Sequence, residues 1–435
     1  LNNERAKYKS LKKLMTHFIK SILAGLLLLL MFIPLIQFTG KFIDENPLNG
    51  HFDAIKKPDL TKKSWLSGDF QNQYKTYFKE QAGFSNFFVR LHNQIHYSLF
   101  KQVNTKDVVV GKNNVLYDGR HINALQGKDF IGVEQIKKNV IQLRNVTDSL
   151  KDNGKEILIV LAPNKARYFR NEIPATTKII GPTNYDNYIN YFKQFNIAYI
   201  DFNEWFVQQK SKHKINLIPK YGIHWSEYAA ALVEDSIINY CNQHFGYQLP
   251  YYRVSNLISS KIPSDLDYDL GKSLNLFKKP TDENYQYFDK KLISGSKKRL
   301  LAIGDSYFNV LYLTGFTKDI FETDGLWYYN REVLKDNSPP LPPKPLEEVL
   351  PEKDVVIIML TEWNLYRLGF GIIEEIDSYY TGTKIESNEV RYFIDRIRSD
   401  PEWLEKERNK AIERGIPLDT MILKTAKYMV RTKSS

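Results

Sequence analysis

Three short runs of apolar residues recur along the middle of the chain. They occupy residues 157–161, 300–303 and 355–360. Uncharged runs of this length are typical of strands that are covered on both faces. Segments with helical spacing separate them, and alternating strands and helices favour a parallel sheet. We therefore predict an α/β fold with a doubly wound parallel sheet.

Helical spacing of apolar residues marks several segments between and after these strands. Residues 136–150 show one apolar face, and Ser226 is placed to cap a helix that continues to Ile238. Beyond the last strand, Pro401 is expected to start a helix and Gly415 to end one. A final helix is predicted from residue 418 to residue 430. The carboxyl-terminal part is therefore expected to be a helical extension.

The amino-terminal part contains an uncharged apolar stretch over residues 22–38. At about 1.5 Å per residue, such a helix nearly crosses a hydrocarbon core of about 30 Å. The preceding residues 1–20 carry six basic side chains and one acidic side chain, so the positive-inside rule keeps them in the cytoplasm. The small residues of a signal-peptide cleavage site are missing at 36–39, so we predict an uncleaved signal anchor.

These patterns define an expected order of parts along the chain. A single-pass protein of the inner (cytoplasmic) membrane is predicted, with its carboxyl-terminal domain periplasmic or otherwise extracytoplasmic. Residues 250–295 are less regular and are expected to form an insertion or a flap on the substrate side of the α/β domain. The predicted parts are a basic tail (1–20), a transmembrane anchor (21–39), a stalk with lead-in helices (40–105), the α/β domain (106–370) and the helical extension (371–435).

Charge and cysteine content exclude some classes of protein. The net charge is +11, and a basic surplus on the exported body favours an anionic polymer or headgroup, although ordinary solubility explains it equally well. No nucleic-acid-binding motif is present, so a nucleic-acid partner is not expected. The single cysteine, Cys241, excludes an intramolecular disulfide and a metal–cysteine cluster.

Two segments far apart in the chain carry residues for acyl transfer. Residues 300–306 form an apolar run that ends in Gly-Asp-Ser, which places Ser306 at the carboxyl end of a strand. Residues 221–226 contain an isolated His-Trp pair, and His224 could activate a serine hydroxyl as a general base. Ligands bind at the carboxyl ends of parallel strands, where Asn164, Asp201 and Glu362 are also predicted to lie.

The order of these segments resembles the SGNH-hydrolase-like domain of alginate O-acetyltransferases. The resemblance covers roughly residues 105–370 and rests on four motifs in sequence order. It implies that His224 is the base and Ser306 the nucleophile, in a periplasmic or membrane-anchored protein that acetylates exported polysaccharides. It also implies a multipass membrane O-acyltransferase as the source of the acetyl group. The motifs are Gly-Lys-Asn-Asn-Val-Leu-Tyr at 111–117, Ala-Pro-Asn-Lys at 162–165, His-Trp-Ser at 224–226 and Gly-Asp-Ser at 304–306.

One position departs from the family pattern. The family carries an orienting aspartate two residues before the histidine, and this chain has Gly222 there. Loss of such a carboxylate can cost about 10⁴ in rate. Asp201, Glu227 or Glu362 could substitute for it, a Ser-His dyad could suffice, or the domain could have lost catalysis and kept polymer binding.

Further residues are expected to shape the site around Ser306. The backbone N–H of Ser306, together with the side chain of Asn164 or Asn364, would hold the oxyanion. Asp305 is expected to play a structural role beside the nucleophile, and Tyr307 to shape the site. The mechanism requires no metal or organic cofactor, and the other histidines lack metal-ligand spacing.

Three functions remain open at this point. The first is transfer of an acetyl group to a hydroxyl of a cell-surface polysaccharide that acts as the acceptor. The second is a periplasmic carbohydrate or lipid esterase, in which water replaces the sugar. The third is a catalytically impaired component of an export complex that binds polysaccharide or acts as a scaffold.

Overall fold

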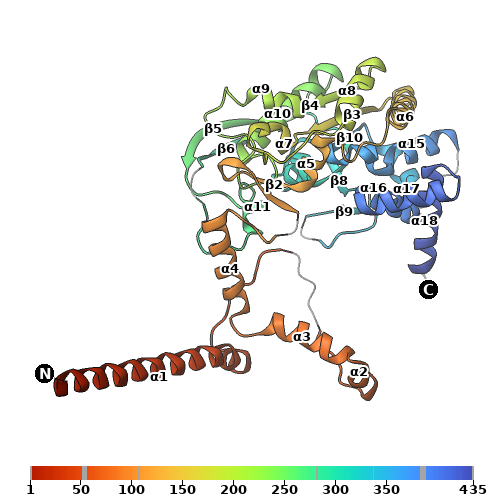
Figure 1. The fold of residues 1–435 in the computed structure, drawn as a ribbon. Helices are drawn as coiled ribbons and strands as arrows, with labels where there is room; N and C mark the ends of the chain where they lie inside the picture. The colour runs from red at the N-terminus through yellow and green to blue at the C-terminus, as the bar shows by residue number, and fades with distance from the viewer. Residues whose placement is uncertain are drawn as a thin grey trace. The chain divides into compact units, whose positions relative to one another are not determined.

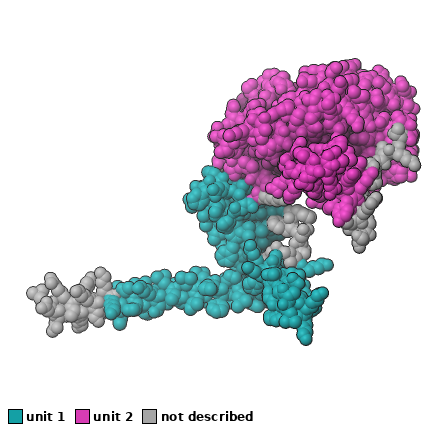
Figure 2. Space-filling model, turned by 45° about the vertical axis from the view of Figure 1, so that its right-hand side comes forward, with its two compact units in different colours: residues 1–104, 272–279 teal, residues 105–271, 280–435 magenta. Residues whose placement is uncertain are grey.

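The chain forms two compact units in the computed structural model. Residues 2–50, 56–105, 107–280, 283–336, 338–382 and 388–433 are described by the structure. The first unit comprises residues 1–104 and 272–279, and the second comprises residues 105–271 and 280–435 (Figure 2). The segment 272–279 therefore groups with the amino-terminal part, although it lies inside the stretch predicted as an insertion.

The first unit is helical. Its first helix, α1, runs from Asn2 to Gly40 with Pro34 inside it. Within α1, the 28-residue segment Lys13–Gly40 is long and apolar enough to cross a membrane, with a mean hydropathy of 2.5. Three further helices follow, α2 (Lys62–Ser67), α3 (Asp69–Gln81) and α4 (Ser85–Phe100).

A six-stranded sheet forms the centre of the second unit (Figure 1). Its strand order is β4-β3-β10-β7-β8-β9, with parallel pairing throughout except for the antiparallel edge strand β9. The predicted α/β fold with a doubly wound parallel sheet is confirmed. The strands are β3 (Glu156–Ala162), β4 (Tyr199–Asp201), β7 (Arg299–Gly304), β8 (Glu322–Tyr328), β9 (Glu332–Leu334) and β10 (Val355–Thr361).

Both faces of the sheet are covered, which explains the uninterrupted apolar runs. Along β10, Ile357 and Met359 belong to the hydrophobic cluster on one face, whereas Ile358 and Leu360 belong to the cluster on the other. Each fully buried aliphatic side chain contributes about 1.5–3 kcal/mol. The first cluster is covered by α5 (Gly119–Gln126), α7 (Lys165–Tyr168), α9 (Phe202–Gln209), α10 (Glu227–His244), α12 (Ser306–Leu313) and α13 (Phe316–Ile320). The second is covered by α6 (Val133–Asp152), α8 (Asn184–Gln194), α14 (Leu346–Val349) and α15 (Ile372–Thr381).

The carboxyl-terminal extension is helical, as the sequence predicts, and three helices follow α15 in its described residues. They are α16 (Asn388–Ser399), α17 (Pro401–Glu413) and α18 (Leu418–Lys433). Asp400 caps α17 through the backbone N–H groups of Glu402 and Trp403. Val390, Phe393 and Ala426 form a small apolar cluster of their own between α16 and α18.

The insertion contains an element that the sequence analysis did not predict. Strands β5 (Tyr251–Ser260) and β6 (Tyr285–Ile293) form an antiparallel pair, with the short helix α11 (Asp269–Lys272) between them. Most residues of β5 are exposed and none of β6 except Tyr285 is buried, so apolar and polar residues do not alternate and the strand pattern is hidden. Smaller elements complete the unit: β1 (Val108–Val110), β2 (Leu116–Asp118), and short 3-10 turns η1 (Lys112–Asn114), η2 (Arg170–Glu172), η3 (Leu350–Glu352) and η4 (Glu362–Gly371).

Candidate active site

Ser306 lies at the tight turn between β7 and α12. A Cβ at Gly304 would approach Cβ of Phe308 to 2.7 Å and the carbonyl oxygen of Met359 to 2.8 Å, so the turn admits only glycine. Asp305 caps α12 by accepting a hydrogen bond from the backbone N–H of Tyr307 at 3.0 Å. Ser306 is therefore the first residue of the helix, and its side chain is partly exposed.

Asp305 fixes this turn to the end of β10. Its Oδ2 accepts hydrogen bonds from the backbone N–H of Thr361 (2.7 Å), the hydroxyl of Thr361 (2.8 Å) and Nδ2 of Asn364 (2.7 Å). Asp305 and its partners are buried. The carboxylate therefore holds the loop of the proposed nucleophile in place, which fits the structural role expected for it.

His224 has a carboxylate partner. Its Nδ1 lies 2.5 Å from Oδ2 of Asp269 in α11. The other oxygen of Asp269 accepts a hydrogen bond from the backbone N–H of Ile223 at 2.7 Å. Asp269 thus binds both the imidazole and the backbone beside it, which fixes the ring and places a proton on Nδ1.

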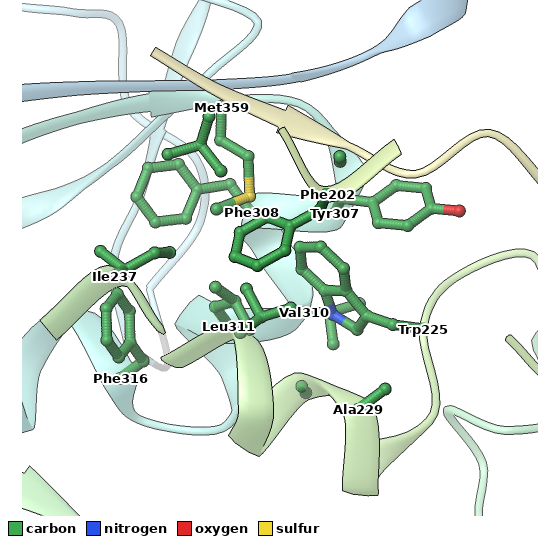
Figure 3. Close-up of a cluster of buried hydrophobic side chains, with 14 of the residues drawn as sticks. Phe202, Trp225, Ala229, Ile237, Tyr307, Phe308, Val310, Leu311, Phe316 and Met359 are labelled. Carbon is green, nitrogen blue, oxygen red and sulfur yellow. The ribbon is translucent and has the colours of Figure 1, made fainter. Parts of the chain in front are cut away.

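Tyr307 joins the serine-bearing turn to the histidine segment. Its ring lies 4.8 Å from the ring of His224 and 4.9 Å from that of Trp225, and its hydroxyl donates to the carbonyl oxygen of Ile223 at 2.6 Å. Figure 3 shows Tyr307 and Trp225 within the buried cluster that underlies the site. The residue next to Ser306 therefore packs directly on His224.

The second ring nitrogen of His224, Nε2, forms no hydrogen bond with the described residues. This nitrogen is buried. Ser306 and His224 accordingly do not bond to each other in this structure. Nε2 is the atom that would accept a proton from a serine or sugar hydroxyl, with Nδ1 already held by Asp269.

Asp269 is a correction to the sequence analysis, which named three other acids. Asp201 caps α9 and accepts the hydroxyl of Tyr185 at 2.7 Å, so it is engaged elsewhere. Glu227 contacts Asp267 through its backbone N–H. Glu362 lies at the start of η4 in a separate buried network. In the described chain, none of the three bonds to His224.

Glu362 forms that network with Arg167. The guanidinium donates to both carboxylate oxygens, at 2.6 Å and 2.8 Å, and Asn164 and Asn203 each donate an amide N–H to Oε2. Burial lowers the pKa of Arg167, but the charge of Glu362 and its hydrogen bonds outweigh this effect and raise that pKa above its usual range. Glu362 is therefore a structural acid that ties the end of β10 to α7.

The two asparagines expected at the oxyanion are committed to protein partners. Asn164 donates to Glu362 and to the carbonyl oxygen of His121 (3.0 Å), and its oxygen caps α7. Asn364 donates to Asp305 and accepts from Arg367. The side-chain amides of both asparagines are therefore occupied by protein groups and serve to hold the loops of the site. At the start of α12 the backbone N–H of Tyr307 is already used by Asp305, so the backbone N–H of Ser306 is the donor that remains from the sequence prediction.

Lys165 supports the loop that precedes His224. Its ammonium group is buried and donates to the carbonyl oxygens of Pro219 (2.7 Å), Lys220 (2.8 Å) and Gly222. Burial lowers the pKa of Lys165, while the carboxylate of Glu283 opposes that shift. The three bonds fix the backbone just before the histidine.

His121 is a second buried histidine near the site. Its ring lies 6.4 Å from that of Tyr307, and burial lowers its pKa to about 4. It is therefore a neutral packing residue at ordinary pH. Within the described residues, no three His, Cys, Asp or Glu side chains gather as a metal site.

A serine at a strand end and a His-Asp pair on an α/β sheet are residue types suited to acyl transfer. Residues 108–265 match the family model described as "SGNH hydrolase-like domain, acetyltransferase AlgX". The resemblance inferred from the sequence is thereby confirmed for this segment. The match includes His224 and ends before Asp269 and Ser306.

Parts of this chain are also similar to three solved structures. The O-acetyltransferase domain of Pseudomonas putida AlgJ is 16% identical, with 62% of this chain and 99% of that chain covered and a TM-score of 0.41. Pseudomonas aeruginosa AlgX is 14% identical (64% and 71% covered, TM-score 0.39), and Bacillus cereus PatB1 is 12% identical (55% and 93% covered, TM-score 0.36). No curated protein sequence gives a significant match. Because these TM-scores lie below 0.5, the assignment rests on the family match.

Proposed function

We propose that this chain is an O-acetyltransferase that moves an acetyl group through Ser306 to a hydroxyl of a polysaccharide. The observation that carries the proposal is the His224–Asp269 pair, packed through Tyr307 against the Ser306 turn. The match of residues 108–265 to an acetyltransferase family supports the same chemistry.

The proposed reaction has two half-steps. In the first, the Ser306 hydroxyl attacks the carbonyl carbon of the acetyl donor, Nε2 of His224 takes the serine proton, and that proton passes to the leaving group. In the second, a sugar hydroxyl attacks the acetyl-serine, gives its proton to Nε2 and regenerates Ser306 when that proton returns to Oγ. Asp269 stabilises the imidazolium in both half-steps.

The proposed setting is the outer side of the inner membrane. The apolar segment Lys13–Gly40 supports a single-pass anchor, with the catalytic unit extracytoplasmic. We further propose a multipass membrane O-acyltransferase as the acetyl source, since an acetyl donor made in the cytoplasm must be passed across the bilayer. The acceptor is an exported polysaccharide.

Two alternatives remain for the same site. An esterase would use water in place of the sugar hydroxyl in the second half-step, and the residues would be unchanged. A catalytically impaired scaffold was suggested by Gly222, which leaves the family's aspartate position without a carboxylate. Asp269 offers a carboxylate to His224 from another segment, which supports the enzyme over the scaffold.

The test uses the purified full chain with a chromogenic acetyl ester, with and without a polysaccharide acceptor. We expect ester turnover that is lost in Ser306→Ala and in His224→Ala, and acetyl groups that appear on the polymer. Release of free acetate at the same rate with or without polymer would favour the esterase. Turnover that survives in both variants would contradict the assignment, and polymer binding without turnover would favour the scaffold.

A further inference from the structure

The helix α16 of the carboxyl-terminal extension packs against η4, the segment that follows β10 in the same compact unit. η4 is not a regular helix. Arg367 and Leu368 have non-helical dihedral angles, and Gly369 and Phe370 have φ +74° and +57°. Such a segment lacks the continuous backbone hydrogen bonds of a helix. Its position therefore depends on contacts with side chains.

Within η4, Arg367 fixes the orientation of the Asn364 amide. Its Nε and Nη2 donate to Oδ1 of Asn364, at 3.3 Å and 2.9 Å. Nδ2 of Asn364 then donates to Oδ2 of Asp305 at 2.7 Å. If the amide turned over, its oxygen would face the carboxylate and its NH₂ group would face a guanidinium that can only donate. Arg367 thus selects the one orientation in which Asn364 bonds to Asp305.

Asp305 transmits this restraint to the turn that carries Ser306. It caps α12, whose first residue is Ser306, and the oxygen that accepts from Asn364 also accepts the backbone N–H of Thr361. Asn364 and Asp305 are fully buried, so water cannot replace a donor that is lost. A carboxylate that loses one donor is expected to shift toward the donors that remain, and the turn shifts with it.

α16 holds Arg367 from the opposite side. Oδ2 of Asp395 lies 3.9 Å from Nη1 of Arg367, the guanidinium nitrogen that does not bond to Asn364. The side chain of Arg367 is only 10% exposed, and its guanidinium lies 4.8 Å from the ring centre of Tyr329 and 5.0 Å from that of Phe370. The guanidinium is therefore held on both sides, by Asn364 and by Asp395.

A second side chain of α16 holds the end of η4. Nη1 of Arg391 donates to the carbonyl oxygen of Gly371 at 2.9 Å and to Oε1 of Glu375 at 3.3 Å. Asp395 lies one helical turn further along α16. Burial raises the pKa of Asp395, and the strongest of the positive charges that oppose this shift is that of Arg367. α16 thus holds η4 at two points, one turn apart.

We propose that the carboxyl-terminal extension positions the turn that carries Ser306. Asp395 of α16 holds Arg367, and Arg367 acts on that turn through the amide of Asn364. Asp395 and Arg367 are positioning residues, since they act through other side chains and touch no reacting atom. The inference rests on the proposed function and concerns the same site. It gives a role to helices outside residues 108–265, the segment that the family model matches.

The first test makes the same substitution at two arginines of the full chain. Arg367→Gln removes the donors to Asn364, whereas Arg396 of α16 is exposed and donates to Tyr392 of its own helix. We expect Arg367→Gln to lower kcat for an acetyl ester about tenfold to a hundredfold, as loss of a charged hydrogen bond allows, with KM within about twofold. Arg396→Gln should leave both within about twofold. Equal effects, or a change in KM alone, would overturn the proposal.

The second test asks whether α16 acts through Arg367. Asp395→Asn should lower kcat about threefold to fivefold, at the upper end for an ion pair because both side chains are largely buried. Asp419→Asn removes an ion pair with Arg398 inside the extension and should leave kcat within about 1.5-fold. In an Arg367→Gln background, Asp395→Asn should cause no further loss, and an additive loss would overturn the proposal. A wild-type chain without Ser306-dependent turnover would defeat the proposed function alone, and the next measurement would then decide the positioning.

Hydrogen exchange gives a readout that does not depend on activity. The backbone N–H of Thr361 bonds to Oδ2 of Asp305 at 2.7 Å. Its exchange should speed up in Arg367→Gln and in Asp395→Asn, and should keep the wild-type rate in Arg396→Gln. Amides in the first half of β10 should exchange at the wild-type rate in all three variants, which separates a local change from a general loss of stability. Unchanged protection of Thr361 in the first two variants would overturn the proposal.

Discussion

Oδ2 of Asp269 lies 2.5 Å from Nδ1 of His224, although 45 positions separate the two residues. The family pattern would place this carboxylate two residues before the histidine, where this chain has Gly222. The carboxylate is thus supplied by the insertion between β5 and β6. His224 therefore pairs with a carboxylate here without the local Asp-x-His motif.

Replacement of Asp269 by Asn should lower kcat for an acetyl ester by at least about a hundredfold. The amide keeps the size of the side chain but cannot stabilise the imidazolium and permits the wrong tautomer. Steady-state kinetics measure the effect. Asp289→Asn is the matched control, since Asp289 lies in the same insertion and bonds only to Asn256 among the hydrogen bonds described for it. Equal activity of the two variants would contradict the role of Asp269.

Gly222→Asp should not raise the turnover of an acetyl ester. We expect kcat to fall by a few fold in this variant. A Cβ at position 222 would lie 3.0 Å from the carbonyl oxygen of Asp267 and 3.3 Å from Cβ of Pro219, so the loop before His224 would have to shift. Gly222→Ala should cause the same loss, because the cause is steric. A clear gain for aspartate over alanine would show that the upstream position can still orient the histidine.

Asp305→Asn should lower the free energy of unfolding by about 2–4 kcal/mol, because three donors converge on one buried oxygen of the carboxylate. An amide would leave at least one of them poorly paired. Thermal unfolding of the full chain measures the change, with Asp289→Asn again as an exposed control. An unchanged midpoint for Asp305→Asn would show that the network adds little stability.

Stability should fall as the pH drops from about 6.5 to about 4, in part through His121. Burial lowers its pKa to about 4, although Asp118 opposes the shift while Arg120 and Lys165 add to it. The folded state keeps the imidazole of His121 neutral, whereas in the unfolded state this ring takes up a proton as the pH falls below about 6.5. The free energy of unfolding is therefore fully present above about pH 6.5 and decreases as the pH is lowered toward about 4. The shift corresponds to about 3 kcal/mol. Thermal midpoints at pH 7 and 4.5 should therefore differ less in His121→Gln than in the wild type, and identical differences would contradict this account.

The sequence predicts the sheet, and leads to the proposal of Ser306 and His224 as site residues, because these signals are local. Val356, Ile358 and their alternating neighbours are all apolar, since helices cover both faces. Ser306 and His224 each stand in a short motif whose order along the chain is informative. The partner of His224 has no such signal, because Asp269 is one of several acids in a polar stretch and meets the histidine only through tertiary folding.

The misplaced predictions have a common physical origin. Asn164 and Glu362 do lie just after the carboxyl ends of strands, as predicted, and Asn364, which was expected at the oxyanion, lies in η4 after β10. The polar groups of all three are used by one another and by Asp305 and Arg167. Position at a strand end identifies residues near a site. It does not reveal which of them retain free donors or acceptors once the buried hydrogen bonds are satisfied.

The central claim is that the hydroxyl of Ser306 carries the acetyl group, and trapping of the acyl-enzyme tests it most directly. The full chain is mixed with an acetyl ester, quenched in acid within the first turnover and digested for peptide mass analysis. We predict one acetyl group on the peptide that contains Ser306, formed more slowly in Asp269→Asn and absent in Ser306→Ala. An acetyl group on a different residue, or turnover with no acetyl-serine at any time, would contradict the account.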